Sequence, residues 1–289
     1  MKKETLSSEH EKILSDKLTN IDTALSEYSF ANLYLFRDKH NYSLIDYHDN
    51  LFLSGITYDN KTFLMPLCDL SNKENEAYLS DLIALSVDYE MIYPIPENWL
   101  YLFPTDSFDI SYIEDDSDYL YEIETFVSYP GRKLHAKRNL VSQFLRDNTA
   151  EILPINNENS NLAIDILERW QNETAEAKDE TDFFSCAEAL KNINKMNQIG
   201  FMVLINGIPE GFVLGERYAQ KYCVIHFAKA GSRIKGIYQY MFSVFAQNNK
   251  EKQCDFINLE QDLGKEGLRA MKKSYQPIKL LQKYRVTRK

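Results

Sequence analysis

The segment FMVLINGIPEGFVLGER, residues 201–217, decides the fold of the second half of the chain. Asn206-Gly207 separates two apolar runs, and both positions of such a two-residue turn take positive φ, which Asn and Gly adopt most readily. The segment therefore predicts an antiparallel β-hairpin. A further strand, expected from Tyr222 to Ala228, extends the hairpin into a meander.

Helices are expected on both sides of this meander. Ser160 can cap a helix whose apolar residues recur at helical spacing up to Trp170, and a second helix is expected from Phe183 to Met196. After the meander, GIYQYMFSVFAQ (236–247) also has a helical period. A short strand over Asp255–Leu259, one more helix and a final strand complete the order.

The first half repeats this order more faintly. Short strands are expected over 43–48, 51–58 and 61–66, followed by a helix over 75–86 and a strand over 91–94. The chain is thus predicted to be α/β, with two similar units in tandem, each a mixed, mostly antiparallel sheet flanked by helices. We place the units at residues 1–128 and 129–289, and expect the second to carry the function.

A basic segment, SYPGRKLHAKRNLVSQFLRD (128–147), links the two predicted units. Ser128 and Pro130 suit the start of a helix, and residues 136, 140 and 144 are spaced for one buried face. Four cations crowd the N-terminal half, where the helix dipole favours acids instead. Either a bound anion or pairing with the acidic stretch 114–118 would explain these cations. The four are Arg132, Lys133, Lys137 and Arg138.

The distribution of charge along the chain limits the ligands that the protein is expected to bind. The net charge of the 289 residues is -10. From Gly264 onward nine cations face one carboxylate, a net charge of +8, so residues 1–263 carry -18. This acidic bulk argues against general coating of nucleic acid, while the basic tail suits one local anionic ligand. The alternative is a solvated basic helix face.

Segments for export or membrane insertion are not expected. The start MKKETLSSEHEK is too polar for a signal peptide, and no apolar run approaches the ~20 residues of a membrane helix. The four cysteines lie far apart without CxxC or a His at ligand spacing, so no metal site is expected. Scattered thiols are typical of a cytoplasmic protein.

Three motifs resemble a known family. GRKLHAKRN (131–139), VIHFAKA (224–230) with GIYQ (236–239), and NLEQDLGKEGLRAMKKSYQP (258–277) resemble soluble relatives of the phosphatidylglycerol lysyltransferase C-terminal domain. The resemblance implies two GNAT-like folds in tandem and transfer of an acyl or aminoacyl group from an activated ester or thioester. It implies aminoacyl-tRNA or acyl-coenzyme A as donor substrate and no tightly bound cofactor.

The resemblance also bears on the acceptor. Lipid-modifying members carry a membrane-spanning half, which is not in this sequence, so a small-molecule or peptide acceptor is expected, with an amine or hydroxyl nucleophile. tRNA is a candidate partner. A catalytically inactive binding or regulatory module remains the alternative.

The coenzyme A loop of GNAT acetyltransferases, Q/R-x-x-G-x-G/A, has only a partial match at residues 233–238. Arg233 and Gly236 fit this pattern. Tyr238 occupies the last small position, which weakens the coenzyme A interpretation because the backbone there must approach phosphate.

Four residues are candidates for the chemistry. Glu260 and Asp262 follow a strand, where α/β sheets tend to bind ligands, and could hold or deprotonate an amine. Asp262 could instead cap the last helix or pair with Arg269. His226 is a possible base and Tyr238 a possible proton donor, with a structural role open for both.

The cations of the last helix could hold the phosphates of a donor, or form a solvated face. Residues 265, 269 and 272 share one face of this helix, beside an apolar stripe at 268, 271 and 275. The full set of candidate donor-binding or anion-binding residues is Arg132, Lys133, Lys137, Arg138, Asn139, Lys229, Arg233, Gly236, Gln239, Gly264, Arg269, Lys272 and Tyr275.

Overall fold

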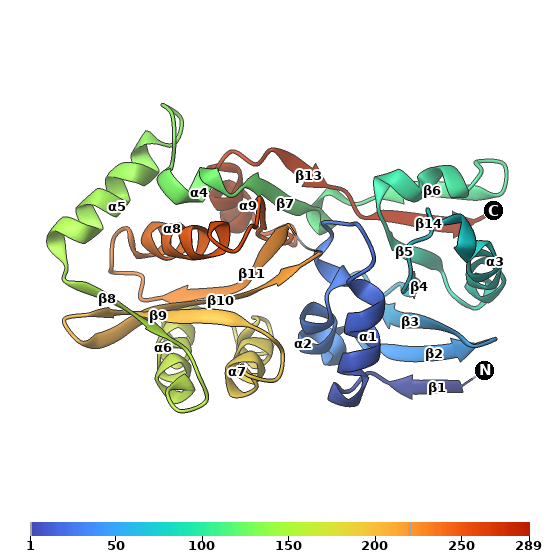
Figure 1. Cartoon of the computed structure of the whole chain (residues 1–289), viewed down its shortest axis with the longest axis horizontal. Helices are drawn as coiled ribbons and strands as arrows, with labels where there is room; N and C mark the ends of the chain where they lie inside the picture. The colour runs from blue at the N-terminus through green and yellow to red at the C-terminus, as the bar shows by residue number, and fades with distance from the viewer. Residues whose placement is uncertain (1, 220) are drawn as a thin grey trace. The chain divides into compact units, whose positions relative to one another are not determined.

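The computed structural model describes residues 2–219 and 221–289, which form two seven-stranded sheets flanked by helices (Figure 1). Each sheet belongs to its own compact unit. Unit 1 comprises the chain up to Asp118 together with Gln261–Glu266 and Leu280–Lys289, and unit 2 comprises Tyr119–Glu260 and Gly267–Lys279. The predicted α/β class, with two units in tandem, is confirmed.

Unit 1 contains the sheet in which both ends of the chain lie (Figure 1). In spatial order its strands are β1 (Lys2–Thr5), β2 (Ser43–Tyr47), β3 (Asn50–Ile56), β4 (Thr62–Pro66), β5 (Met91–Ile95), β14 (Tyr284–Arg288) and β6 (Phe108–Tyr112). The longer helices are α1 (Glu11–Leu18), α2 (Phe30–His40) and α3 (Glu76–Leu85). The short 3-10 helices are η1 (Ser8–His10), η2 (Ser26–Tyr28), η3 (Lys73–Asn75), η4 (Ser86–Asp88), η5 (Glu97–Leu102) and η6 (Glu114–Asp116).

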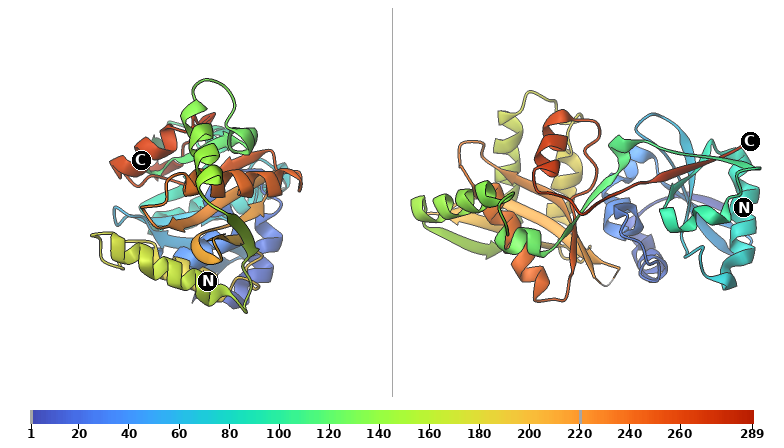
Figure 2. Two further views of the ribbon diagram at one scale, coloured as in Figure 1. Left: turned by 90° about the vertical axis from the view of Figure 1, so that its left-hand side faces the viewer. Right: turned by 90° about the horizontal axis from the view of Figure 1, so that it is seen from above.

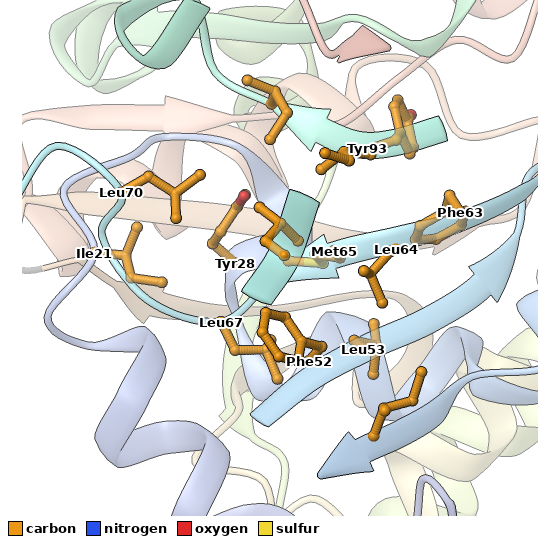
Figure 3. Close-up of a cluster of buried hydrophobic side chains, with 14 of the residues drawn as sticks. Ile21, Tyr28, Phe52, Leu53, Phe63, Leu64, Met65, Leu67, Leu70 and Tyr93 are labelled. Atoms are coloured by element: carbon orange, nitrogen blue, oxygen red, sulfur yellow. The ribbon is translucent and has the colours of Figure 1, made fainter. Parts of the chain in front are cut away.

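Apolar side chains from these strands and helices form one core in unit 1. Phe52, Leu53, Leu64 and Met65 are fully buried on β3 and β4 (Figure 3). Leucines of α1, α2 and α3 pack against the same cluster. The strands and the helix expected within residues 43–94 are confirmed. Strands β3 and β4 are buried on both faces over four consecutive residues, as in the interior of a sheet.

Unit 2 contains the second sheet. In spatial order its strands are β13 (Lys279–Leu281), β7 (Asp118–Glu122), β12 (Phe256–Asn258), β11 (Tyr222–Ala230), β10 (Ile208–Tyr218), β9 (Ile199–Ile205) and β8 (Ala150–Pro154). The helices are α4 (Glu124–Ser128), α5 (His135–Asp147), α6 (Ser160–Glu173), α7 (Phe183–Lys191), α8 (Ile237–Lys250) and α9 (Glu266–Lys273). Helix α8 covers one face of the sheet, and α6 and α7 cover the other (Figures 1 and 2).

The hairpin predicted at Asn206-Gly207 is present. The two residues have φ of 52° and 81°, and they join β9 to β10. The predicted helices and strands around it are also found, except that the second helix ends at Lys191 instead of Met196. Local turn chemistry and periodicity were therefore sufficient for this half of the chain.

Two long-range pairings shift the expected boundary at residues 128/129. Strand β7 pairs antiparallel with β12, so unit 2 begins at Tyr119. The last strand, β14, lies between β5 and β6 and therefore joins unit 1. Neither pairing leaves a local signature, because strand periodicity shows which face is buried and not which strand is the neighbour.

The basic segment also starts its helix later than expected. Tyr129 and Gly131 have positive φ and end the short helix α4, so α5 begins at His135. Arg132 and Lys133 are exposed and precede α5. Of the three residues expected on one buried face, Phe144 is buried, Leu140 is half-buried and Ala136 is exposed.

Gly236 gives a stability prediction. Its φ is +85°, and a Cβ there would lie 2.4 Å from the carbonyl oxygen of Leu140, whereas Gly207 has φ +81° and open space around it. We expect Gly207→Ala to lower the free energy of unfolding by about 1 kcal/mol from backbone strain. Gly236→Ala should cost about 3 kcal/mol because steric overlap adds to that strain. Equal losses in urea unfolding would contradict the close approach at Gly236.

Candidate functional site

Two parallel strands separate in the middle of unit 2. β11 pairs with β12 through Tyr222, Cys223 and Val224, opposite Phe256, Ile257 and Asn258. β12 ends there, while β11 continues to Ala230. Polar side chains that follow the last pair on each strand therefore lie at the point of separation, the kind of sheet edge where ligands bind in α/β proteins.

His226 lies at a β-bulge on β11. Leu214 of β10 is opposite Phe227, but the next residue, Gly215, is opposite Ile225, so His226 is the extra residue. A bulge re-aims a side chain, and it commonly occurs beside functional sites. Gly215 permits the close approach, since a Cβ there would lie 2.0 Å from the Val224 carbonyl oxygen. A glycine inside a strand was the available sequence signal for this bulge.

The imidazole of His226 bridges two carboxylates. Its Nδ1 lies 2.8 Å from Oε1 of Glu260, and its Nε2 lies 3.0 Å from Oε1 of Glu216. The side chain of His226 is completely buried, and the two glutamates are 14% and 10% exposed. Both ring nitrogens must donate when both partners are carboxylates, so this geometry requires the imidazolium form.

The pKa of His226 follows from this environment. Burial alone lowers the pKa of an imidazole, but the charges and hydrogen bonds of Glu260 and Glu216 overcome that effect and raise it to about 10. The ring is therefore charged at neutral pH. A charged ring cannot accept a proton, so the role of base that the sequence left open for His226 does not fit. The ring instead acts as a cation that positions two carboxylates.

Glu260 has a constrained backbone. Its φ is 57°, a left-handed conformation that costs a non-glycine residue about 1–3 kcal/mol and is common at functional sites. Its N–H donates to Oδ1 of Asn258 at 2.6 Å, and its carbonyl accepts from the N–H of Tyr119 at 3.3 Å. These bonds and the imidazolium fix the position of the carboxylate.

Lys272 is a structural residue of unit 2, which corrects the prediction that it lies on an open donor-binding face. It is only 7% exposed, and its Nζ donates to the carbonyl oxygens of Leu259 at 2.6 Å and Glu260 at 3.1 Å. Leu268, expected in the packed stripe, is exposed instead. The last helix is thus rotated relative to the prediction, because the carbonyls that follow β12 are buried and need hydrogen-bond donors.

Three other predicted donor-binding residues form a cluster in unit 2. Tyr275 is fully buried, its hydroxyl accepts from Nε2 of Gln239 at 2.8 Å, and Nζ of Lys137 lies 4.1 Å from its ring centroid. Burial lowers the pKa of Lys137. These three residues meet from α5, α8 and the segment after α9, and their role in donor binding stays a prediction.

Lys229 is held by a buried ion pair. Its Nζ lies 2.7 Å from Oδ1 of Asp182 and 3.6 Å from the ring centroid of Trp170. The side chain of Lys229 is only 8% exposed. An anionic donor would therefore have to displace Asp182 to reach its ammonium group. The contacts of Lys229 with Trp170 of α6 and with Asp182 before α7 explain its position as part of the packing of β11.

The proposed coenzyme A loop is occupied by protein contacts. The hydroxyl of Tyr238 accepts from the N–H of Ala230 and donates to its carbonyl, both at 3.2 Å. Tyr238 thus binds the backbone at the end of β11, and burial raises its pKa. Arg233 is exposed at the start of this loop, and Gly236 precedes α8 as described above.

The remaining candidates of unit 2 lie on α5 and α9. Arg138 donates to the carbonyl oxygen of Tyr129 at 2.5 Å, and Asn139 is exposed with its Nδ2 3.3 Å from the His135 ring. Arg269 is half-buried on α9.

Asp262 and Gly264 belong to unit 1. Asp262 is 1% exposed, and its Oδ1 accepts from the N–H of Gly264 at 2.9 Å, which fits a turn before the last helix. The bond closes a turn that precedes α9, which begins at Glu266, and the capping role stays a prediction.

The acidic stretch 114–118 pairs within unit 1. Arg285 contacts Asp116 at 2.7 Å, and Lys283 contacts Asp118 at 2.7 Å. Asp116 and Asp118 are therefore paired with C-terminal cations. Pairing of this stretch with the basic segment was one of the two explanations for that segment's charge.

Over residues 2–219 and 221–289, no group of His, Cys, Asp and Glu has the arrangement of a metal site. All four cysteines are free thiols. No helix in the described part of the chain is long and apolar enough to span a bilayer.

Lys272→Ala should destabilise the fold, since the carbonyl of Leu259 loses its donor and that of Glu260 loses one of two donors. Each lost partner costs about 1–3 kcal/mol, so we expect a loss of about 3 kcal/mol in the free energy of urea unfolding. Lys252→Ala, an exposed lysine of the same unit, should change it by less than about 0.5 kcal/mol. If both variants unfold alike, Lys272 does not support the strand end.

His226 should make stability depend on pH above neutrality. Because its pKa is about 10 in the folded chain and about 6.5 when unfolded, its contribution is complete below pH 6.5 and is lost as pH rises through 10. The free energy of unfolding of the natural chain should fall across this window, whereas that of His226→Gln should fall less. NMR of the ring checks the same point, and an imidazole signal that titrates near pH 6.5 would refute the bridge.

Comparisons with known proteins agree with this architecture. The family model described as phosphatidylglycerol lysyltransferase, C-terminal, matches residues 19–287. A conserved protein of unknown function from Bacteroides thetaiotaomicron is 23% identical, with 99% of both chains covered and a TM-score of 0.88. No match was found among curated proteins.

Two more distant structures share the fold. L-PGS from Bacillus licheniformis is 16% identical over 99% of this chain and 92% of that one, with a TM-score of 0.69. FemX is 11% identical over 99% and 97% of the two chains, with a TM-score of 0.63. The GNAT-like tandem fold and the resemblance read from the three motifs are confirmed, and the chain belongs to the phosphatidylglycerol lysyltransferase C-terminal domain family.

Proposed function

We propose that this protein transfers an aminoacyl group from an activated ester to an amine or hydroxyl acceptor, with Glu260 as the carboxylate that serves the acceptor. The observation that carries the proposal is the bridge from Glu216 through His226 to Glu260 where β11 and β12 separate. Membership of a lysyltransferase family supports aminoacyl transfer.

The reaction needs no covalent enzyme intermediate. The acceptor nitrogen or oxygen forms a bond to the carbonyl carbon, the ester C–O bond breaks, and the leaving hydroxyl gains a proton. The nucleophile must first lose its proton, a task suited to a carboxylate held in a fixed place. In this chain the imidazolium, Asn258 and Lys272 hold Glu260 in place.

An aminoacyl ester fits the donor better than a coenzyme A thioester. A coenzyme A donor would need an open approach to the backbone at the β11–α8 connection, which the hydroxyl of Tyr238 already contacts at Ala230. Arg132 and Lys133 are exposed cations before α5 that could contact a tRNA phosphate backbone. Binding of tRNA should then weaken steeply with salt.

A second candidate is a ligand-binding module without turnover. It is favoured by the full engagement of both ring nitrogens of His226, which leaves the ring no lone pair for proton transfer. This alternative and the transferase proposal differ only in whether a group is transferred.

One experiment distinguishes the transferase from the binding module. The protein is incubated with a mixed pool of amines and either charged tRNA or acetyl-coenzyme A. Mass spectrometry of the pool should show an aminoacyl adduct with charged tRNA and none with acetyl-coenzyme A. Saturable tRNA binding without any adduct would favour the module. An acetyl adduct alone would overturn the donor assignment.

Glu260→Gln should lower the rate of adduct formation by about 10²–10⁴-fold, because the amide cannot accept the proton. Glu251→Gln, an exposed residue of unit 2, serves as the matched control and should keep the natural rate. Thermal unfolding of both variants tests whether they are folded. Full activity in folded Glu260→Gln would exclude Glu260 as the base.

A further inference from the structure

We infer that unit 1 contains a binding site for an alkylammonium group, formed by an aromatic pocket with carboxylates at its walls. The pocket has a volume of about 20 Å³, room for one or two groups the size of water. It is lined by Glu27, His40, Tyr42, Thr57, Tyr58, Phe63, Tyr93, Asp116 and Gln261, all of which belong to unit 1. This site is separate from the bridge in unit 2 and does not rest on the transferase proposal.

Three polar atoms in this pocket have no protein partner. Among the described residues, no hydrogen bond reaches the hydroxyls of Tyr42 and Tyr93 or Nε2 of His40, although these residues are only 4%, 7% and 8% exposed. None of the three is among the fully buried polar atoms that lack a partner, so each is accessible from the cavity. A small polar ligand that enters the pocket would supply the missing bonds.

His40 presents an acceptor to this ligand. Its Nδ1 lies 2.7 Å from the carbonyl oxygen of Ile56 and must donate to it, which leaves a lone pair on Nε2. Burial lowers the pKa of His40 to about 4, so the ring is neutral at physiological pH. The ligand that matches this nitrogen is a hydrogen-bond donor.

The charges around the pocket favour a cation. Glu27 contacts Lys283 at 2.6 Å, and Lys283 also contacts Asp118. Arg285 pairs with Asp59 and Asp116. This network contains four carboxylates and two cations, and two of the carboxylates, Glu27 and Asp116, line the pocket. A ligand with one positive charge reduces the excess.

Aromatic rings complete the site. Phe63 and Tyr93 lie on the neighbouring strands β4 and β5, with ring centroids 5.3 Å apart (Figure 3). The ring of His40 stacks on Tyr42 at 5.2 Å, and the exposed Tyr58 lies edge-on to His40 at 4.7 Å. Ring faces attract ammonium groups and accommodate the alkyl chain that carries them. An ammonium has three N–H donors, which matches the acceptors described above.

Binding should also release a proton. Burial raises the pKa of Glu27 to about 7, an effect opposed by Lys283 and reinforced by Asp118. The other titratable groups that line the pocket are His40, Tyr42, Tyr58, Tyr93 and Asp116. Because an ammonium favours ionised Glu27, affinity should rise from pH 6 to pH 8.

Ligand-observed NMR on the whole chain tests the site, with methylammonium, butylammonium, N-acetyl-lysine methylamide and potassium as probes. We expect saturable binding of the ammonium compounds in the millimolar range, tighter at pH 8 than at pH 6. Binding of the lysine derivative would identify a lysyl side chain as a possible occupant, whereas binding of the small amines alone would restrict the site to free amines.

Matched variants make the test specific. Tyr42→Phe and Tyr93→Phe each remove one hydroxyl without changing the packed volume, and each should weaken binding roughly fivefold, the worth of one hydrogen bond. Tyr101→Phe alters an exposed tyrosine of the same unit and should have no effect. The proposal is overturned by the absence of saturable binding, by potassium that competes as well as methylammonium, or by equal binding to all three variants.

Discussion

The end of pairing between β11 and β12 is the constraint on which unit 2 depends. Where two parallel strands part, their backbone groups lose partners, and buried groups must find others. Lys272 supplies a donor to two carbonyls after β12, and a bulge turns His226 toward the opening. The same contacts that repair the sheet therefore hold Glu260 in its strained conformation.

Each unit buries a cation between two carboxylates. Such an arrangement costs more desolvation free energy than apolar side chains in the same place would. Unit 2 has an imidazolium between two glutamates, and unit 1 has Lys283 between Glu27 and Asp118. Desolvation of such ions costs several kcal/mol each, and apolar replacements of similar volume are often neutral or stabilising. Stability alone therefore does not account for these residues, while a requirement for fixed carboxylates does.

Local patterns in the sequence predicted most of the elements, and long-range contacts determined the parts that were missed. Asn206-Gly207 is a turn whatever lies elsewhere, so the hairpin was correctly predicted. The burial of Lys272 depends on carbonyls 12 and 13 residues away, and helical spacing indicates a shared face but not what covers it. The pocket of unit 1 joins residues from 27 to 261, which no motif connects.

Electrostatics also bear on the kind of acceptor. Outside its basic tail the chain carries a charge of -18, and both candidate sites contain carboxylates. Such sites attract an amine or the ammonium group of an aminoacyl donor. This attraction supports the amine acceptor proposed above, because the bridge in unit 2 holds a carboxylate where the acceptor would bind.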